Sequence, residues 1–185
     1  MDNGSIAYRR FLDGDNGALC EIIGEYRKGM TAYIMGIVHD ENVSQDICEA
    51  VFVKLCLKRP KDKGGASFKT WLYTIARNTA LDYLRRQKRE KTDSLDLLFE
   101  IGSTESETEK NYFSDERRKT VALCIDELKP EYRQIIFLKF FENFDIEDIA
   151  KIIKKSNHNT SALLYRAKNA LKAELEKKGV TEIEN

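Results

Sequence analysis

The stretch that decides the fold is residues 68–91, which read FKTWLYTIARNTALDYLRRQKREK. Its first turns carry apolar and aromatic residues at helical spacing: Phe68, Trp71, Leu72, Ile75 and Ala76. Its end carries cations: Arg85, Arg86, Lys88, Arg89 and Lys91. One long helix is expected, with Ser67 as its cap. Such a helix suits unpaired nucleic acid, because bases stack on rings and phosphates attract cations; the alternative is that Phe68 and Trp71 belong to the core.

Two helices are expected before this stretch. Residues 13–16 form a cap signal, and apolar residues then recur every three or four positions from Leu19 to Val38. A second helix begins near residues 42–44 and places Ile47, Val51, Phe52 and Leu55 on one stripe. It should end before Pro60, because a residue that precedes proline is disfavoured in helical geometry. The basic loop 58–67 follows, and its two glycines allow close approach to a partner.

The last third of the chain has the pattern of a helix-turn-helix. Pro130 starts one helix, which continues through apolar residues that include Leu138 and Phe140. Asp145 caps residues 146–153, and Ser156 or Asn157 caps a final helix. The residues expected to face inward from that final helix are Thr160, Leu164, Ala167 and Leu171. Two short helices with a tight turn between them, the second flanked by cations, are typical of duplex DNA binding.

The charges are unevenly distributed, although 31 Lys and Arg balance 31 Asp and Glu. Residues 54–91 carry 12 basic and 3 acidic side chains, and residues 150–172 carry 6 basic and none acidic. Between them, residues 92–116 carry 1 basic and 8 acidic side chains. A run of cations is commonly a solvated helix face, but two such stripes favour a protein that binds a polyanion.

Several classes of protein are excluded by the composition. Only 2 prolines and 10 glycines occur, which argues against a β-sandwich or barrel. No apolar run approaches the roughly 18 residues of a membrane span, and the 4 cysteines form no C-x-x-C pair. We therefore expect an all-α, cytoplasmic protein that is no enzyme, contains no metal or cofactor and does not enter a membrane.

Residues 68–86 resemble the promoter-melting helix of bacterial RNA polymerase sigma factors, in the extracytoplasmic-function (ECF) group of the sigma-70 family. Residues 44–55 resemble that family's polymerase-binding helix, and residues 11–15 its usual start. Residues 128–134, 148–150 and 165–171 are similar to its distal promoter-binding domain. This chain departs from the family pattern at Lys154, Lys155 and residues 159–163. Two consequences are possible. Either Ala162 or Leu163 is free to contact a thymine methyl group, or this half of the chain recognises DNA weakly.

The resemblance implies two small helical domains joined by an acidic linker. Residues 1–91 would form a three-helix region 2-like domain, residues 92–116 the linker, residues 117–178 a region 4-like helix-turn-helix domain and residues 179–185 a tail. The linker would either mimic RNA in the polymerase exit path or act as a solvated tether. The chain would direct RNA polymerase to promoters and help to open them.

The resemblance also implies three sets of contact residues. Those for the melted minus-ten element are Lys61, Lys63, Gly64, Gly65, Phe68, Lys69, Trp71, Tyr73, Arg77, Asn78, Arg85, Arg86 and Lys88. Those for the minus-thirty-five element are Lys154, Lys155, Asn157, His158, Asn159, Ser161, Ala162, Tyr165, Arg166 and Lys168. Those for polymerase are Gln45, Asp46, Glu49, Phe52 and Lys54.

The implied partners are the polymerase core, through its beta-prime clamp and beta flap, and promoter DNA in duplex and melted form. An anti-sigma factor is a further candidate partner, and the chain itself is expected to be a monomer. Two other functions are left open by the residues alone. One is a helix-turn-helix regulator that binds duplex DNA without polymerase, and the other is a helical adaptor whose basic stripes meet acidic proteins.

Overall fold

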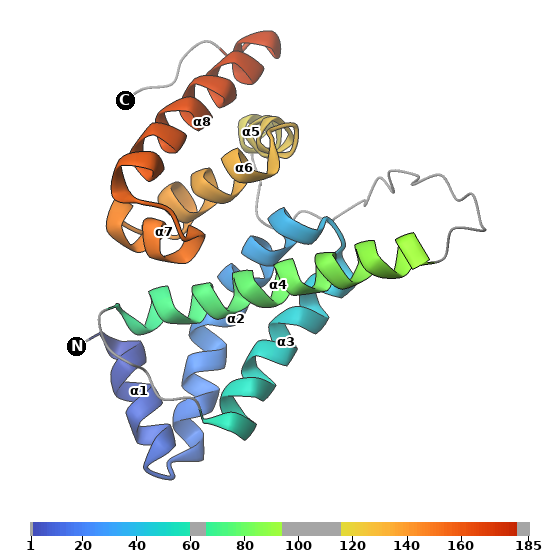
Figure 1. Cartoon of the computed structure of the whole chain (residues 1–185). Coiled ribbons are helices and arrows are strands. Elements are labelled where there is room, and N and C mark those ends of the chain that lie inside the picture. The colour runs from blue at the N-terminus through green and yellow to red at the C-terminus, as the bar shows by residue number, and fades with distance from the viewer. Residues whose placement is uncertain (1, 60–65, 94–115, 181–185) are drawn as a thin grey trace. The chain divides into compact units, whose positions relative to one another are not determined.

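The structure is a computed structural model that describes residues 2–59, 66–93 and 116–180. Every regular element within these ranges is a helix (Figure 1), which confirms the all-α prediction. The chain divides into two compact units, Met1–Glu107 and Thr108–Asn185. Each unit has its own buried core, so each is described by itself.

The first unit contains one helix more than the three predicted. Its helices are α1 (Asn3–Leu12), α2 (Asn16–Val38), α3 (Glu41–Lys58) and α4 (Phe68–Asp93). The additional helix is α1, which buries Tyr8 and Phe11. A helix of ten residues is marginal by itself in water, so it is stabilised by packing on α2 and α4 rather than by any long local pattern.

The ends of these helices are fixed by short side chains. Asp15 caps α2 through the backbone N–H groups of Gly17 and Ala18, and Asp40 caps α3 through that of Val43. Helix α3 ends at Lys58, as the following proline predicted, and the next residue is left-handed with φ of 41°. These local signals explain why the sequence predicted α2 and α3 well.

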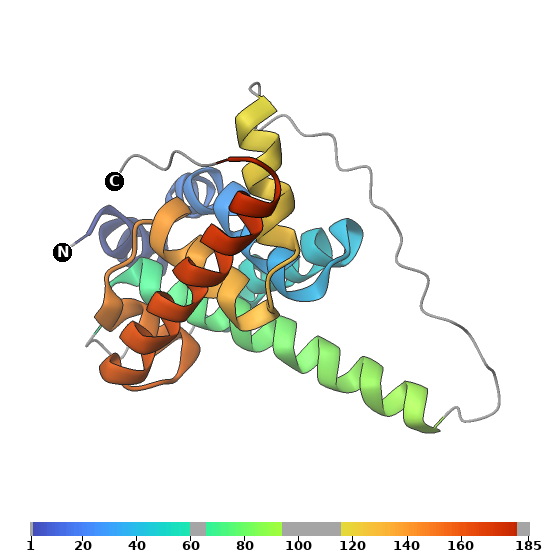
Figure 2. The same cartoon turned by 90° about the horizontal axis from the view of Figure 1, so that it is seen from above.

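Helix α4 packs across α2 and α3 and touches α1. Its first half is buried among them, and its last turns extend past them in both views (Figures 1 and 2). The single long helix predicted for residues 68–91 is therefore confirmed. Its apolar half belongs to the core, and its basic half is exposed to solvent.

The second unit contains α5 (Glu116–Asp126), α6 (Pro130–Ile136), the π-helix η1 (Phe137–Phe141), α7 (Ile146–Ile153) and α8 (Asn157–Lys177). As predicted, Pro130 occupies the first turn of α6 and Asp145 caps α7. Of the two caps proposed for the last helix, Ser156 is the one observed. The turn between α7 and α8 runs through Lys154, which is left-handed with φ of 57°.

The apolar residues of η1 face both the core and the solvent. Leu138 is fully buried, whereas 52% of the surface of Phe140 is exposed. The wider π-helical turn of η1 changes which side chains face inward, and a sequence pattern with the α-helical period does not anticipate this.

Arg133 joins α5 to α6 from inside the second unit. Its guanidinium donates hydrogen bonds to the backbone oxygens of Asp126, at 2.8 Å, and Leu128, at 3.0 Å. Burial lowers the pKa of Arg133, and the nearby Asp126 carboxylate partly opposes that effect. The carbonyls at the end of α5 thus receive the donors that the helix itself cannot supply.

Two further findings bear on the site. Among the residues that the structure describes, no helix is long and apolar enough to cross a membrane. The same residues contain no group of three or more His, Cys, Asp or Glu side chains arranged to hold a metal ion.

Candidate nucleic-acid interface

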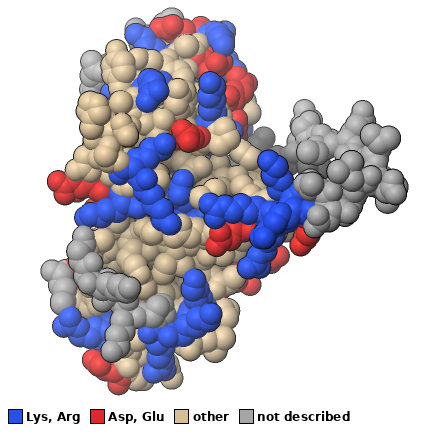
Figure 3. Space-filling model, in the orientation of Figure 1, with Lys and Arg blue, Asp and Glu red and all other residues tan. Residues whose placement is uncertain are grey.

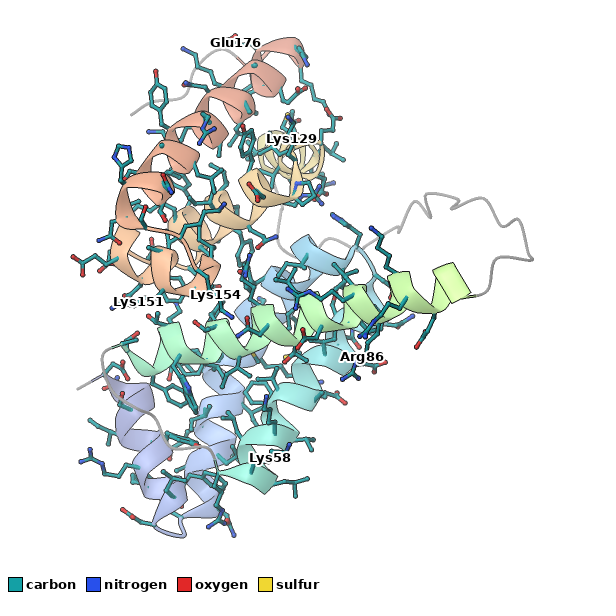
Figure 4. The ribbon with its side chains drawn as sticks, viewed as in Figure 1. Lys58, Arg86, Lys129, Lys151, Lys154 and Glu176 are labelled. Atoms are coloured by element: carbon teal, nitrogen blue, oxygen red, sulfur yellow. The ribbon has the colours of Figure 1, made fainter. Side chains whose placement is uncertain are left out.

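The exposed half of α4 presents a cationic surface. Arg85, Arg86 and Lys88 are all exposed on its last turns, where blue side chains gather in Figure 3. Arg85 pairs with Asp82 one turn earlier, at 2.8 Å. Figure 4 shows Arg86 projecting away from the helix. Cations on a helix face that extends into solvent can neutralise a phosphate backbone without any change in the fold.

The aromatic half of α4 differs from the prediction. Phe68 and Tyr73 were expected to contact bases, but both are fully buried. The Phe68 ring lies 5.2 Å from that of Tyr8, 5.7 Å from that of Tyr26 and 5.6 Å from that of Trp71, centroid to centroid. These assignments are wrong because the rings are needed to join α1, α2 and α4.

Four half-buried residues of α4 stay candidates for contact with an unpaired strand: Lys69, Trp71, Arg77 and Asn78. The ammonium of Lys69 lies 5.8 Å from the centre of the Tyr73 ring, which holds this cation beside the first turns of the helix. Candidates Lys61, Lys63, Gly64 and Gly65 lie outside the described residues.

The outer face of α3 is the candidate surface for polymerase. Gln45, Asp46, Glu49 and Lys54 are exposed there, and Glu49 pairs with Arg27 of α2 at 3.0 Å. Phe52 does not belong to this surface, because it is buried in the core. The assignment of Phe52 to the polymerase contacts is therefore wrong, and its place on the apolar stripe of this helix is confirmed.

Two apolar residues on this face were missed. Val53 and Leu57 lie one and two turns beyond Glu49, and 77% of Leu57 is exposed. Exposed side chains of this kind, rimmed by polar ones, favour contact with another protein. Their positions four and eight residues beyond Glu49, on the same helical face, were a signal in the sequence.

The first turns of α8 form a second exposed polar surface. Ser156 accepts a hydrogen bond from the backbone N–H of Asn159 at 3.2 Å, and thereby starts the helix. The candidates exposed on or just before this helix are Lys154, Lys155, Asn157, His158, Asn159, Ser161, Tyr165, Arg166 and Lys168. Ala162 is half-buried. The side chains are therefore placed to enter a groove while Thr160 and Ala167 face the core.

The structure revises the predictions for three leucines of α8. Leu163 was considered free to meet a thymine methyl group, but it is only 5% exposed and belongs to the core. It lies three residues beyond the buried Thr160, on the same helical face. Leu164 and Leu171 are half-buried rather than fully enclosed.

A groove of about 660 Å³ lies where the start of α6 meets α8. Its lining includes the cations Lys129, Lys155 and Arg166 together with Asn159. Glu131 also lines it, with a carboxylate oxygen 3.9 Å from the Lys155 ammonium. Lys129, which Figure 4 labels at the start of α6, was missed, because the sequence does not show that this turn faces α8.

Comparison with known proteins gives the same division of the chain. The family model described as Sigma-70 region 2 matches residues 22–90, and that of Sigma-70, region 4 matches residues 118–171. The RNA polymerase sigma-H factor of Pseudomonas aeruginosa is 29% identical over 172 residues, which are 88% of each chain. The ECF RNA polymerase sigma-E factor of Escherichia coli is 27% identical over 174 residues, which are 90% of this chain and 91% of that one.

Solved structures share the fold. The sigma factor RpoE from Bartonella quintana, in complex with the anti-sigma factor NepR, matches with a TM-score of 0.69 at 22% identity and covers 84% of this chain and 95% of its own. CnrH, in complex with the cytosolic domain of CnrY, matches with a TM-score of 0.66 at 16% identity. The match covers 95% of this chain and 99% of the CnrH chain.

The chain is therefore an RNA polymerase sigma factor built from regions 2 and 4. Within that class it belongs to the extracytoplasmic-function group of the sigma-70 family.

Proposed function

We propose that this sigma factor divides its work among three helices. The outer face of α3 would bind the polymerase core, α4 would hold the melted minus-ten element, and α8 would read the minus-thirty-five duplex. The observation that carries the proposal is the presence of two exposed cationic helix surfaces, one in each compact unit. Phosphate contacts position a protein on DNA, and each surface can supply them.

The domain roles follow from this division. Residues 1–91 would bind polymerase and the melted strand, and residues 117–178 would bind the duplex. Residues 92–116, most of which lie outside the described residues, would act as the linker. Residues 179–185 would form a tail after the second domain. The chain would perform no covalent chemistry, would act as a monomer, and would work in the bacterial cytoplasm, where polymerase and promoter DNA are found.

The experiment is a transcription selection with purified core polymerase and a library of randomised promoters. The holoenzyme should enrich two short elements at a fixed spacing, and polymerase without this chain should enrich neither. DNA retention by the isolated chain is measured in parallel. Tight sequence-specific binding without polymerase would overturn the proposal in favour of an autonomous regulator.

A protein inhibitor is a second proposed partner. The Bartonella quintana structure with the same fold is a complex with an anti-sigma factor, and the exposed apolar residues of α3 would suit such a partner here. Leu57→Lys should weaken capture of the core polymerase, and it should weaken an inhibitor in the same way if both cover this face. Pull-down of each from cell extract with wild-type and Leu57→Lys chains checks this.

A further inference from the structure

The carboxylate of Asp2 connects two helices that lie far apart in the sequence. One oxygen, Oδ1, accepts the backbone N–H of Ser5 at 2.6 Å and so caps α1. The other oxygen, Oδ2, accepts the backbone N–H of Phe68, the first residue of α4, at 2.9 Å. One side chain therefore satisfies a donor at each of two helix starts.

The contribution of Asp2 to α4 does not duplicate that of the helix's own cap. Ser67 serves the next donors: its Oγ accepts from the N–H of Thr70 at 3.1 Å, and its backbone oxygen from that of Trp71 at 3.0 Å. The Phe68 N–H is bonded by Asp2. The first turn of α4 is thus held partly by its own sequence and partly by α1.

Packing adds to this hydrogen bond. The Tyr8 ring of α1 lies 5.2 Å from the Phe68 ring and 5.3 Å from the Trp71 ring, centroid to centroid. Gly4 of α1 lies so close that an added Cβ would be 2.6 Å from Phe68 Cδ1 and 2.6 Å from the Tyr26 hydroxyl. Such a close approach leaves the first turn of α4 little room to shift.

We propose that α1 is a clamp on the first turn of α4, with Asp2 as the positioning residue that sets how the half-exposed Trp71 meets the melted strand. The inference rests on the proposed role of α4. Trp71 follows the clamped Phe68 by less than one helical turn, so a fixed Phe68 also fixes the Trp71 backbone. A binding surface fixed in advance loses less entropy when the strand arrives.

The test uses the full chain with two matched substitutions. Asp2→Asn keeps one side-chain oxygen, and asparagine caps a helix as well as aspartate does, but its amide group offers a donor where Oδ2 was an acceptor. Asp40→Asn makes the same change at the cap of α3, where the side chain bonds to Val43 of that helix. Gly4→Ser supplies an independent disturbance of the same contact.

Two readouts are measured. Trp71 is the single tryptophan of the chain, so acrylamide quenching of its fluorescence reports on this turn. Opening is followed with 2-aminopurine in the minus-ten element of a promoter recovered by the transcription selection. Core binding and thermal unfolding are recorded for every variant.

For Asp2→Asn we expect stronger quenching and about tenfold less open complex at unchanged core affinity, because one hydrogen bond to a charged acceptor is lost. Asp40→Asn should change neither readout, and Gly4→Ser should change both. Opening equal to that of wild type in Asp2→Asn would overturn the clamp, as would an equal loss in Asp40→Asn. If the wild-type holoenzyme opens no promoter, the proposed function fails. In that case the clamp is tested by fluorescence alone, and acrylamide quenching of Trp71 that is unchanged in Asp2→Asn would overturn it.

Discussion

Helices α4 and α8 both carry candidate DNA contacts, but they begin in opposite ways. In the first turn of α4, Phe68 is buried against the rings of Tyr8 and Tyr26, and its N–H is bonded to Asp2, the cap of α1. The first turn of α8 is exposed and is capped by the adjacent Ser156. Phe68 at the start of α4 is therefore part of the fold, whereas the exposed residues 157–159 at the start of α8 can change with little cost to it. This difference predicts which substitutions damage stability and which alter promoter choice.

The largest expected effect is on stability. Phe68→Ala should lower the free energy of unfolding of the first unit by about 3–5 kcal/mol, because it leaves a cavity among the rings that join α1, α2 and α4. Thermal and urea unfolding measure this. Phe140→Ala is the matched control, since half of that ring is already exposed and its removal should cost little. Equal losses in the two variants would contradict the buried position of Phe68.

The next effect is on specificity and concerns α8. Asn159→Ala should relax promoter preference at one position of the minus-thirty-five element by about 1–3 kcal/mol, because asparagine can pair with adenine through two hydrogen bonds. Stability and core binding should not change, since Asn159 is exposed.

A repeat of the promoter selection measures this change. Asn169→Ala, an exposed asparagine farther along the same helix, is the control. Uniform weakening across all sequences in Asn159→Ala, with no change in preference, would show that this residue contacts only the backbone.

A smaller effect is expected at the basic end of α4. Arg86→Ala should weaken holoenzyme binding to all promoters alike and reduce the slope of log affinity against log salt by about 1. Arg9→Ala, which removes an exposed cation from α1, should leave the slope unchanged. If both variants behave alike, the cations of α4 are no more than a solvated face.

The smallest effect is a dependence on pH. The hydrogen bond from Arg10 holds the pKa of Asp15 below its usual value, and the N–H groups of α2 that Asp15 caps act in the same direction. Because the pKa of Asp15 is lowered by folding, its contribution to the free energy of unfolding is complete above the usual carboxyl pKa. That contribution is lost as the pH falls through the lower pKa of the folded state. Circular dichroism during acid titration should show a small loss of stability there, which Asp15→Asn lacks.

Much of the fold could be predicted because its signals are local. Asp15, Ser67, Asp145 and Ser156 all cap the helices assigned to them. Helix α1 was missed because its stabilising contacts come from residues distant in sequence. The burial of Tyr73 and Leu163 was missed for the same reason, whereas a core position for Phe68 was the stated alternative. Where a helix carries apolar residues on more than one face, its sequence does not show which of these residues are buried in the core.

The buried guanidinium of Arg133 bears on how this protein can change over generations. Two of its acceptors are the backbone oxygens of Asp126 and Leu128, so substitution of either side chain does not remove the need for a donor. A lysine ammonium is more strongly hydrated and loses more on burial, and an uncharged side chain would leave the end of α5 without these bonds. Arginine should therefore be inherited unchanged at this position.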